Sequence, residues 1–135
     1  MVDASALVLA VAGKDAAARA LGDRLGRIRV HAPHLVDAEC GNVLRRHERA
    51  GLLSAEEAGA ARAAAALLVD ERYPHLSPLA DAAWVLRHNL SYYDALYAAL
   101  AAGLRIPLLT ADERLAHAPG LPCEIDLFAH QDNHP

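Results

Sequence analysis

Short apolar runs typical of strands alternate with longer helical segments along the chain, and no other feature constrains its fold as strongly. The runs are brief and apolar, which is typical of strands buried on both faces. We expect strands at residues 1–3, 27–33, 105–112 and 122–128, with a brief extended piece at 73–77. Strands that alternate with helices predict an α/β layer fold with a buried parallel sheet.

Helix signals fill the intervals between these runs. Ser54 and Glu57 have the spacing of a capping box, and Gly13 and Gly51 are typical stop residues. We expect helices at residues 4–13, 14–25, 34–51, 52–72, 78–89, 89–101 and 113–118. No repeat, low-complexity block or linker interrupts the 135 residues, which suffice for one ordinary domain. We therefore expect one domain over residues 1–128 and a loose polar tail at 129–135.

Composition and charge restrict the class of protein. Hydrophobic residues make up 54% of the chain and charged residues 22%, which allows a packed core and argues against global disorder. The net charge of −4 is unlike that of a non-specific nucleic-acid binder, which is normally basic. It does not exclude a nuclease whose positive charge comes from metal ions and local arginines. Of the 13 basic residues all except Lys14 are Arg, the better bidentate phosphate ligand, although the base composition of the gene produces the same bias.

The cysteines and the apolar start bear on the cellular compartment. Cys40 and Cys123 are far apart and form no CxxC pattern, so they predict two buried free thiols in a cytoplasmic protein. The apolar residues after Asp3 follow no basic region and are too few to span a bilayer. We therefore expect neither a signal peptide nor a membrane segment.

Two carboxylates follow expected strands. Asp3 ends the first, and Asp112 follows the strand that contains Thr110. Ligands of open α/β sheets bind beyond the carboxyl ends of the strands, so both residues are candidates for a site. An Asp after a strand also often caps a helix, and Asp112 would lie in a first turn whose capping box is Thr110-x-x-Glu113. For each residue taken singly, a structural role and a role in a site are equally open.

Glu39 is more informative because of its helical phase. It is four residues from both Leu35 and Val43, which places it at the edge of the apolar stripe of its helix. Asp37 lies about 200° around the same helix and falls on the solvent side. A buried carboxylate is costly unless something compensates its charge, and no Lys or Arg lies within a turn on the same face as Glu39. A metal ion would compensate it.

Asp94 has two interpretations. Ser91-x-x-Asp94 has the spacing of a capping box, which gives the carboxylate a local role. Alternatively the side chain faces a pocket and holds a cation. Together with the three acids above it would form a cluster that is unstable without cations, and oxygen ligands suit Mg²⁺ and Mn²⁺. Two such ions about 4 Å apart can activate water and stabilise a leaving oxygen in phosphodiester cleavage. We therefore interpret Asp94 as a metal ligand that also helps its helix end.

Four motifs carry a resemblance to a known family. "VDASALV", "AECGNVLRR", "LSYYDALYAALA" and "PLLTADERLA" resemble the PIN-domain ribonucleases, and more narrowly the VapC toxins of bacterial toxin–antitoxin pairs. The resemblance covers essentially the whole chain in order. It implies a three-layer α/β/α sandwich with a five-stranded parallel sheet in the order 3-2-1-4-5. The acidic quartet of the family carries over onto Asp3, Glu39, Asp94 and Asp112, and its supporting residues match Ser5, Asn42 and Thr110.

The same resemblance implies the activity and the partners. The family consists of Mg²⁺- or Mn²⁺-dependent endoribonucleases that cut structured RNA, often tRNA or rRNA. Its VapC members act as toxins of type II VapBC systems, usually dimerise, and are held inactive by a VapB-type antitoxin. The two helices joined around "RAGLLS" resemble the clamp that the family uses for dimer and antitoxin contacts, although ordinary intramolecular packing is the alternative.

Rival interpretations are weaker but specific. A non-catalytic interaction module with the same fold would not need four intact acids. A phosphate-accepting receiver domain needs a late Lys near its site, and the only Lys is Lys14. The pair His31 and His34 has no matching second pair for zinc, so solvated or capping histidines are favoured. Four aromatic residues could stack on RNA bases, but their helical spacing favours core packing. They are Trp84, Tyr92, Tyr93 and Tyr97.

Overall fold

A computed structural model describes residues 1–129 of the chain. Within them, helices alternate with short strands in the order α1, α2, β1, α3, α4, β2, α5, α6, β3, α7, β4. The helices are α1 (Ala4–Ala12), α2 (Ala16–Leu25), α3 (Leu35–Arg49), α4 (Ala55–Leu68), α5 (Leu79–Val85), α6 (Tyr92–Leu104) and α7 (Glu113–Ala116). The strands are β1 (His31–Pro33), β2 (Glu71–Tyr73), β3 (Leu108–Thr110) and β4 (Ile125–Leu127). The expected α/β alternation is confirmed.

The strands form two parallel pairs. β1 pairs with β2 and β3 pairs with β4, each over three residues. The resemblance predicted one sheet of five strands. The described residues instead form two sheets of two strands each, because the segment at residues 1–3 is too short to count as a strand. The parallel geometry itself is as predicted.

The N-terminal segment lies between the two pairs. Val2 forms an isolated parallel bridge with Leu109 of β3. Its backbone N–H donates to the carbonyl of His31 in β1 at 3.1 Å. The N–H of Leu109 donates to the carbonyl of Met1 at 2.8 Å, and the N–H of Asp3 donates to the carbonyl of Leu109 at 3.2 Å. Backbone hydrogen bonds therefore join Met1–Asp3 to both neighbours and bring Asp3 to the end of β3.

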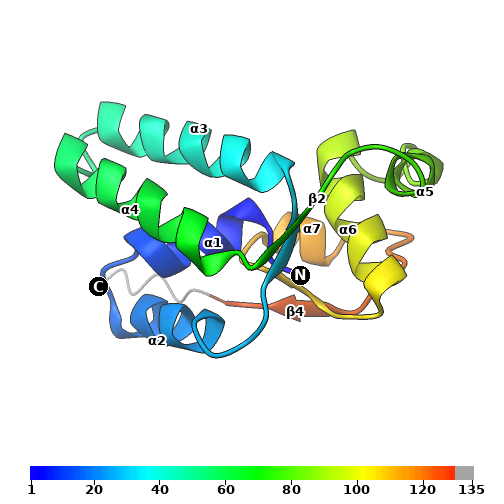
Figure 1. Ribbon diagram of the computed structural model, residues 1–135, viewed down its shortest axis with the longest axis horizontal. Helices are drawn as coiled ribbons and strands as arrows, with labels where there is room; N and C mark the ends of the chain where they lie inside the picture. Colours follow the sequence, from blue (N-terminus) through cyan, green and yellow to red (C-terminus); the bar gives the residue numbers. More distant parts are fainter. Residues whose placement is uncertain (130–135) are drawn as a thin grey trace.

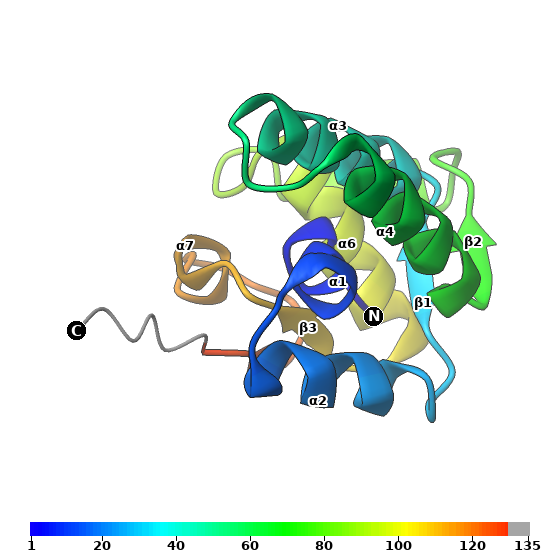
Figure 2. The same cartoon turned by 90° about the vertical axis from the view of Figure 1, so that its left-hand side faces the viewer.

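Helices cover the strands on more than one side (Figures 1 and 2). α3 and α4 run antiparallel to each other on one side of α1, and α2 lies on its other side. α5 packs on α6, which contacts β1 and β3. Every residue from Ala95 to Ala101 in α6 is buried, as expected for a helix that is apolar on all faces. No helix within residues 1–129 is both long and apolar enough to cross a membrane.

Local signals explain where several helices begin and end. The capping box at the start of α4 is confirmed, because Ser54 Oγ accepts from the N–H of Glu57 and Glu57 accepts from the N–H of Ser54. Gly13 ends α1. Gly51 follows α3 with a φ of +76°, a conformation that favours glycine.

Other boundaries differ from the sequence expectations. The helix expected at 52–72 ends at Leu68, because residues 71–73 pair with β1 instead of continuing the helix. The helix expected at 78–89 ends at Val85, and α6 runs on to Leu104 beyond its expected end. Cys40 is buried as expected, whereas Cys123 is only half-buried, and both thiols are free. Most of the expected polar tail, residues 130–135, lies outside the described residues.

Candidate active site

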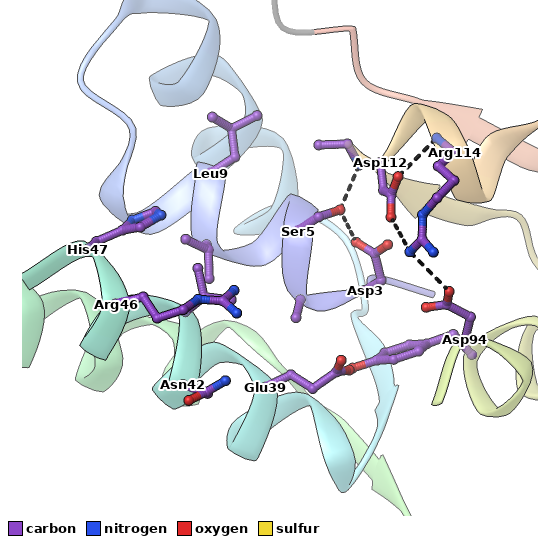
Figure 3. A pocket seen from close by; sticks show the side chains of 15 residues that line it. Asp3, Ser5, Leu9, Glu39, Asn42, Arg46, His47, Asp94, Asp112 and Arg114 are labelled. Carbon is purple, nitrogen blue, oxygen red and sulfur yellow. Dashed lines mark hydrogen bonds and ion pairs between the residues drawn. The ribbon is translucent and has the colours of Figure 1, made fainter. Parts of the chain in front are cut away.

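A pocket of about 510 Å³ lies where α1, α3, α6 and the turn before α7 meet. All four carboxylates singled out in the sequence line it, although they come from well-separated segments (Figure 3). They are Asp3, Glu39, Asp94 and Asp112. The topology therefore gathers the predicted residues around one cavity.

Asp3 is the most deeply held of the four. Its side chain caps α1, because Oδ1 accepts from the N–H of Ala6 at 3.0 Å. The same oxygen accepts from the Ser5 hydroxyl at 2.7 Å, and Oδ2 accepts from the Thr110 hydroxyl. Burial raises the pKa of Asp3, and the three hydrogen bonds oppose that shift while the charge of Asp112 adds to it. Asp3 is thus both a helix cap and a pocket carboxylate.

The two carboxylate oxygens of Asp112 have different partners. Oδ1 caps α7 by accepting from the N–H groups of Arg114 at 2.9 Å and Leu115 at 3.3 Å. Oδ2 instead faces the Arg114 guanidinium at 3.4 Å. The capping box expected from Thr110 to Glu113 is wrong, because Asp112 caps the helix and the Thr110 hydroxyl points to Asp3.

Glu39 lies on the pocket side of α3, as its helical phase predicted. Oε1 accepts from the Tyr97 hydroxyl at 2.6 Å. Burial raises the pKa of Glu39, the Tyr97 hydrogen bond opposes this, and the charges of Asp94 and Asp3 add to it. Asp37 is exposed on the opposite side and pairs with Arg72 through two hydrogen bonds, of 2.6 and 2.9 Å.

Asp94 faces the pocket from the first turn of α6. Its backbone N–H donates to Ser91 Oγ at 3.1 Å, which is one half of the expected capping box. Its carboxylate lies 3.7 Å from the Arg114 guanidinium. Burial is the main reason that the pKa of Asp94 is raised, and the positive charge of Arg114 opposes the shift. The side chain therefore interacts with the pocket, while the helix is capped by the Ser91 hydroxyl.

The supporting residues that the resemblance implied differ in their contacts. Ser5 Oγ donates to Asp3 and accepts from the N–H of Ala111 at 2.9 Å. The Thr110 hydroxyl accepts from the N–H of Asp112 at 3.0 Å while it donates to Asp3. Asn42 is exposed and lines the pocket one helical turn from Glu39. Ser5 and Thr110 thus hold the Asp3 carboxylate and tie it to the turn that carries Asp112.

The donor set fits a hard divalent cation by its chemistry. All four predicted ligands are carboxylates, and three of them have a raised pKa, which means that their charges are poorly compensated. As the side chains stand, no three His, Cys, Asp or Glu residues within residues 1–129 are grouped closely enough to hold a metal ion. The Arg114 guanidinium contacts both Asp94 and Asp112 (Figure 3).

Four further pocket residues were missed by the sequence reasoning. Tyr97 donates to Glu39 from the buried face of α6, and Arg114 contacts two of the acids. Arg46 and His47 line the pocket from α3. Arg46 is seven residues after Glu39 and therefore lies on the same helix face, so helical periodicity could have found it. Tyr97 is three residues after Asp94 and lies on the same helix face, so the same periodicity could have found it, whereas Arg114 carries no comparable signal.

The aromatic residues correct one expectation. Tyr97 is buried in the core as predicted, but Trp84, Tyr92 and Tyr93 are 58%, 37% and 60% exposed. Trp84 contacts Tyr92 edge to face, and the Arg87 guanidinium lies over the Trp84 ring. Core packing is therefore wrong for these three, because Tyr92 and Tyr93 lie in the exposed first turn of α6, before its buried stretch, and Trp84 lies on an exposed face of α5.

The histidines do not form a zinc pair. His31 is hydrogen-bonded through Nδ1 to the Tyr73 hydroxyl at 2.8 Å, and His34 is exposed. His75 Nε2 accepts from the N–H of Leu35 at 2.9 Å and so caps α3. The preference for solvated or capping histidines therefore holds for His34, which is exposed, and not for His31, which is half-buried against Tyr73.

Comparisons with known proteins agree with this arrangement. Residues 1–121 match the PIN domain family. The chain is 54% identical to Ribonuclease VapC1 of Mycobacterium tuberculosis (strain ATCC 25618 / H37Rv) over 127 residues, which cover 94% of this chain and 96% of that protein. It is 40% identical to Ribonuclease VapC9 of the same strain over 125 residues, which cover 93% and 94% of the two chains. The chain therefore belongs to the PIN-domain family and, within it, to the VapC-type ribonucleases.

Proposed function

We propose that the chain is a Mg²⁺- or Mn²⁺-dependent endoribonuclease that acts as the toxin of a type II VapBC pair. The observation that carries the proposal is the pocket, where four carboxylates from four separate elements meet. Within residues 1–129 only Arg114 pairs with any of them, so the acidic charge exceeds what the fold itself compensates. The names of the VapC relatives support RNA as the substrate.

The residue roles follow from the contacts. Asp3, Glu39, Asp94 and Asp112 are proposed to hold the divalent cations. When bound, such ions activate water and stabilise the leaving oxygen of a phosphodiester. Because Ser5 and Thr110 both bond to Asp3, they keep that carboxylate oriented toward the pocket. Asn42 is placed to contact either Glu39 or the substrate backbone.

Proton transfer and substrate binding need groups that the pocket contains. Glu39 is half-buried with a raised pKa, so it is suited to accept a proton from the attacking water. Arg46 and His47 line the wall formed by α3, where Arg46 offers positive charge and His47 a ring nitrogen to RNA phosphates. The net charge of −4 makes general attraction to RNA weak, so recognition rests on these local groups. We propose tRNA or rRNA as the target class.

The partners follow from the VapC relationship. We propose a VapB-type antitoxin, a homodimer and a cytoplasmic location. The paired helices α3 and α4, which protrude together in Figure 1, are the proposed clamp for these contacts. Leu52 and Leu67 are 63% and 85% exposed there, which supports an interface on this part of the molecule.

The order of the strands is also a proposal. The bonds on both sides of Met1–Asp3 support a single layer in which the segments containing Tyr73, Ala32, Val2, Leu109 and Asp126 lie side by side. In chain numbering this is the order 3-2-1-4-5 in a three-layer sandwich. We propose that this one domain spans residues 1–128.

One experiment tests the activity. Purified protein is incubated with bacterial total RNA in Mg²⁺, in Mn²⁺ or in excess chelator, and new 5′ ends are mapped. We expect defined cuts that disappear with chelator and with Asp3→Asn. Strong cleavage by highly purified protein in chelator would overturn the metal mechanism. No cleavage of any RNA, with retained binding to an antitoxin, would favour the non-catalytic interaction module.

A further inference from the structure

Arg114 occupies a central position among the pocket carboxylates. One of its guanidinium nitrogens, Nη2, lies 3.7 Å from Asp94 Oδ2 and 3.4 Å from Asp112 Oδ2 (Figure 3). The two oxygens belong to different elements, α6 and the turn before α7. Among the described residues no other basic side chain pairs with a pocket acid. A single positive nitrogen is therefore shared by two of the four proposed metal ligands.

The oxygens that Arg114 contacts are the available ones. Asp112 Oδ1 is already used to cap α7 through two backbone N–H groups, which leaves Oδ2 for a cation. The Asp94 carboxylate lies beside the Ser91 hydroxyl that caps α6, and its Oδ2 contacts Arg114. A divalent cation that joined Asp94 to Asp112 would need Asp112 Oδ2 and would take the place between the two carboxylates that the Arg114 guanidinium fills. The guanidinium and such a cation are thus mutually exclusive partners.

Arg114 can leave this position easily. Its side chain is 80% exposed, so both ion pairs are screened by water and salt. A hard divalent cation gains more from two carboxylate oxygens than one nitrogen of a solvated guanidinium does. The arginine therefore competes with a metal ion but does not exclude it.

We propose that Arg114 is the built-in counter-ion of the metal-free pocket, which holds the Asp94 and Asp112 carboxylates and gives up their shared oxygens when a divalent cation binds. The inference rests on the proposed function, since it presumes that these acids bind metal. Its consequence is regulatory: Arg114 raises the metal concentration at which the pocket fills. It is a positioning residue that acts through the two carboxylates.

A matched control variant separates the effect of the Arg114 contacts with the two carboxylates from the effect of losing one positive charge. Removing any arginine makes the pocket more negative and so attracts cations. Arg46 lines the same pocket but, in the part of the chain that the structure describes, forms no ion pair. Arg46→Gln therefore removes the same charge from the same cavity without vacating the two oxygens. Only Arg114→Gln does both.

The experiment measures Mn²⁺ binding by titration calorimetry on wild type, Arg114→Gln and Arg46→Gln at low salt. We expect Arg114→Gln to bind Mn²⁺ about three- to tenfold more tightly than wild type, the range that two exposed ion pairs can supply. Arg46→Gln should tighten Mn²⁺ binding less than Arg114→Gln does, because within residues 1–129 Arg46 pairs with none of the pocket carboxylates and its loss frees no carboxylate oxygen. Without metal, Arg114→Gln should also melt below wild type, and saturating Mn²⁺ should close that gap.

The outcomes are distinct. Unchanged or weaker Mn²⁺ binding by Arg114→Gln would overturn the counter-ion role. The proposed function would still stand in that case, provided that the wild-type protein binds Mn²⁺. Equal tightening in both variants would also overturn it, because general electrostatics would then suffice. If wild type itself bound no Mn²⁺ or Mg²⁺, the proposed function would fail and this inference with it.

Discussion

Two carboxylates on α3, Asp37 and Glu39, are two residues apart but lie on different faces of the helix, one exposed to solvent and the other facing the pocket. Asp37 is exposed and accepts two hydrogen bonds from Arg72. Arg72 also donates to backbone carbonyls near the end of α4. Glu39 faces the pocket, has a neutral hydroxyl as its hydrogen-bond partner, and lies near two more acids. A carboxylate with its own arginine stabilises structure, whereas one without a cation is available to a ligand.

The largest expected effect contrasts the two faces directly. Glu39→Gln should lower RNA cleavage by on the order of a thousandfold, because a ligand contact and its charge are lost at the metal site. Asp37→Asn should leave cleavage near wild type. Initial rates on one RNA substrate measure both, and thermal melts check that each variant is folded. Equal loss in the two variants would mean that the division between the faces is wrong.

The contact that orients Glu39 offers a sharper version of the comparison. Tyr97→Phe removes the hydroxyl that donates to Glu39 but keeps the buried ring, so cleavage should fall about tenfold with the chain still folded. Tyr73→Phe is the matched control, since its hydroxyl bonds to His31 away from the pocket. Cleavage rates at several Mg²⁺ concentrations make the measurement. If both variants behaved alike, the Tyr97 bond would not matter for the site.

The pH dependence of stability tests the uncompensated charge of the pocket. Asp3, Glu39 and Asp94 have raised pKa values, so between about 4, the ordinary carboxyl value, and the folded pKa the native state binds more protons than the unfolded one. Their contribution to stability is therefore fully present below pH of about 4 and is lost as pH rises through the folded pKa. Above that window Mg²⁺ should restore stability by binding the native state.

Asp94→Asn makes this contrast specific. Without metal at pH 8 it should melt at or above wild type, gain less from Mg²⁺, and be inactive. A purely structural role would instead cost about 0.5–1 kcal/mol with or without metal. Melts of both proteins at pH 5 and 8, with and without Mg²⁺, distinguish the two. A variant destabilised equally in all four conditions would reject the metal role of Asp94.

The smallest effect belongs to the outer face. Asp37→Asn should lower the free energy of unfolding by about 0.5–1 kcal/mol, because it removes an exposed pair with Arg72. The loss should shrink at high salt, which screens the pair. Denaturant titrations at low and high salt measure it. A loss of several kcal/mol would show that the Asp37–Arg72 pair carries more of the fold than its exposure suggests.

The sequence determined the alternation of helices and strands, the capping of α4 and the division of α3 into two faces. These properties depend on local spacing, and local spacing is visible in the chain. The resemblance also named all four acids that line the pocket. Boundaries were less accurate where pairing between distant segments decides them, as at β2, which pairs with β1 instead of extending α4.

Only the tertiary structure decided what each acid contacts. The hydroxyl of Thr110 was assigned to a helix cap by spacing, yet it bonds to Asp3, a residue at the other end of the chain. Tyr97 meets Glu39 across two helices, and Arg114 meets Asp94 across another pair of elements. Spacing along a chain reports neighbours on the same helix or strand, whereas hydrogen bonds and ion pairs between elements depend on how those elements pack. The acids, and Ser5 and Thr110 beside Asp3, could therefore be named from the resemblance, whereas the roles of Tyr97 and Arg114, which contact Glu39 and Asp94, emerged only from the tertiary structure.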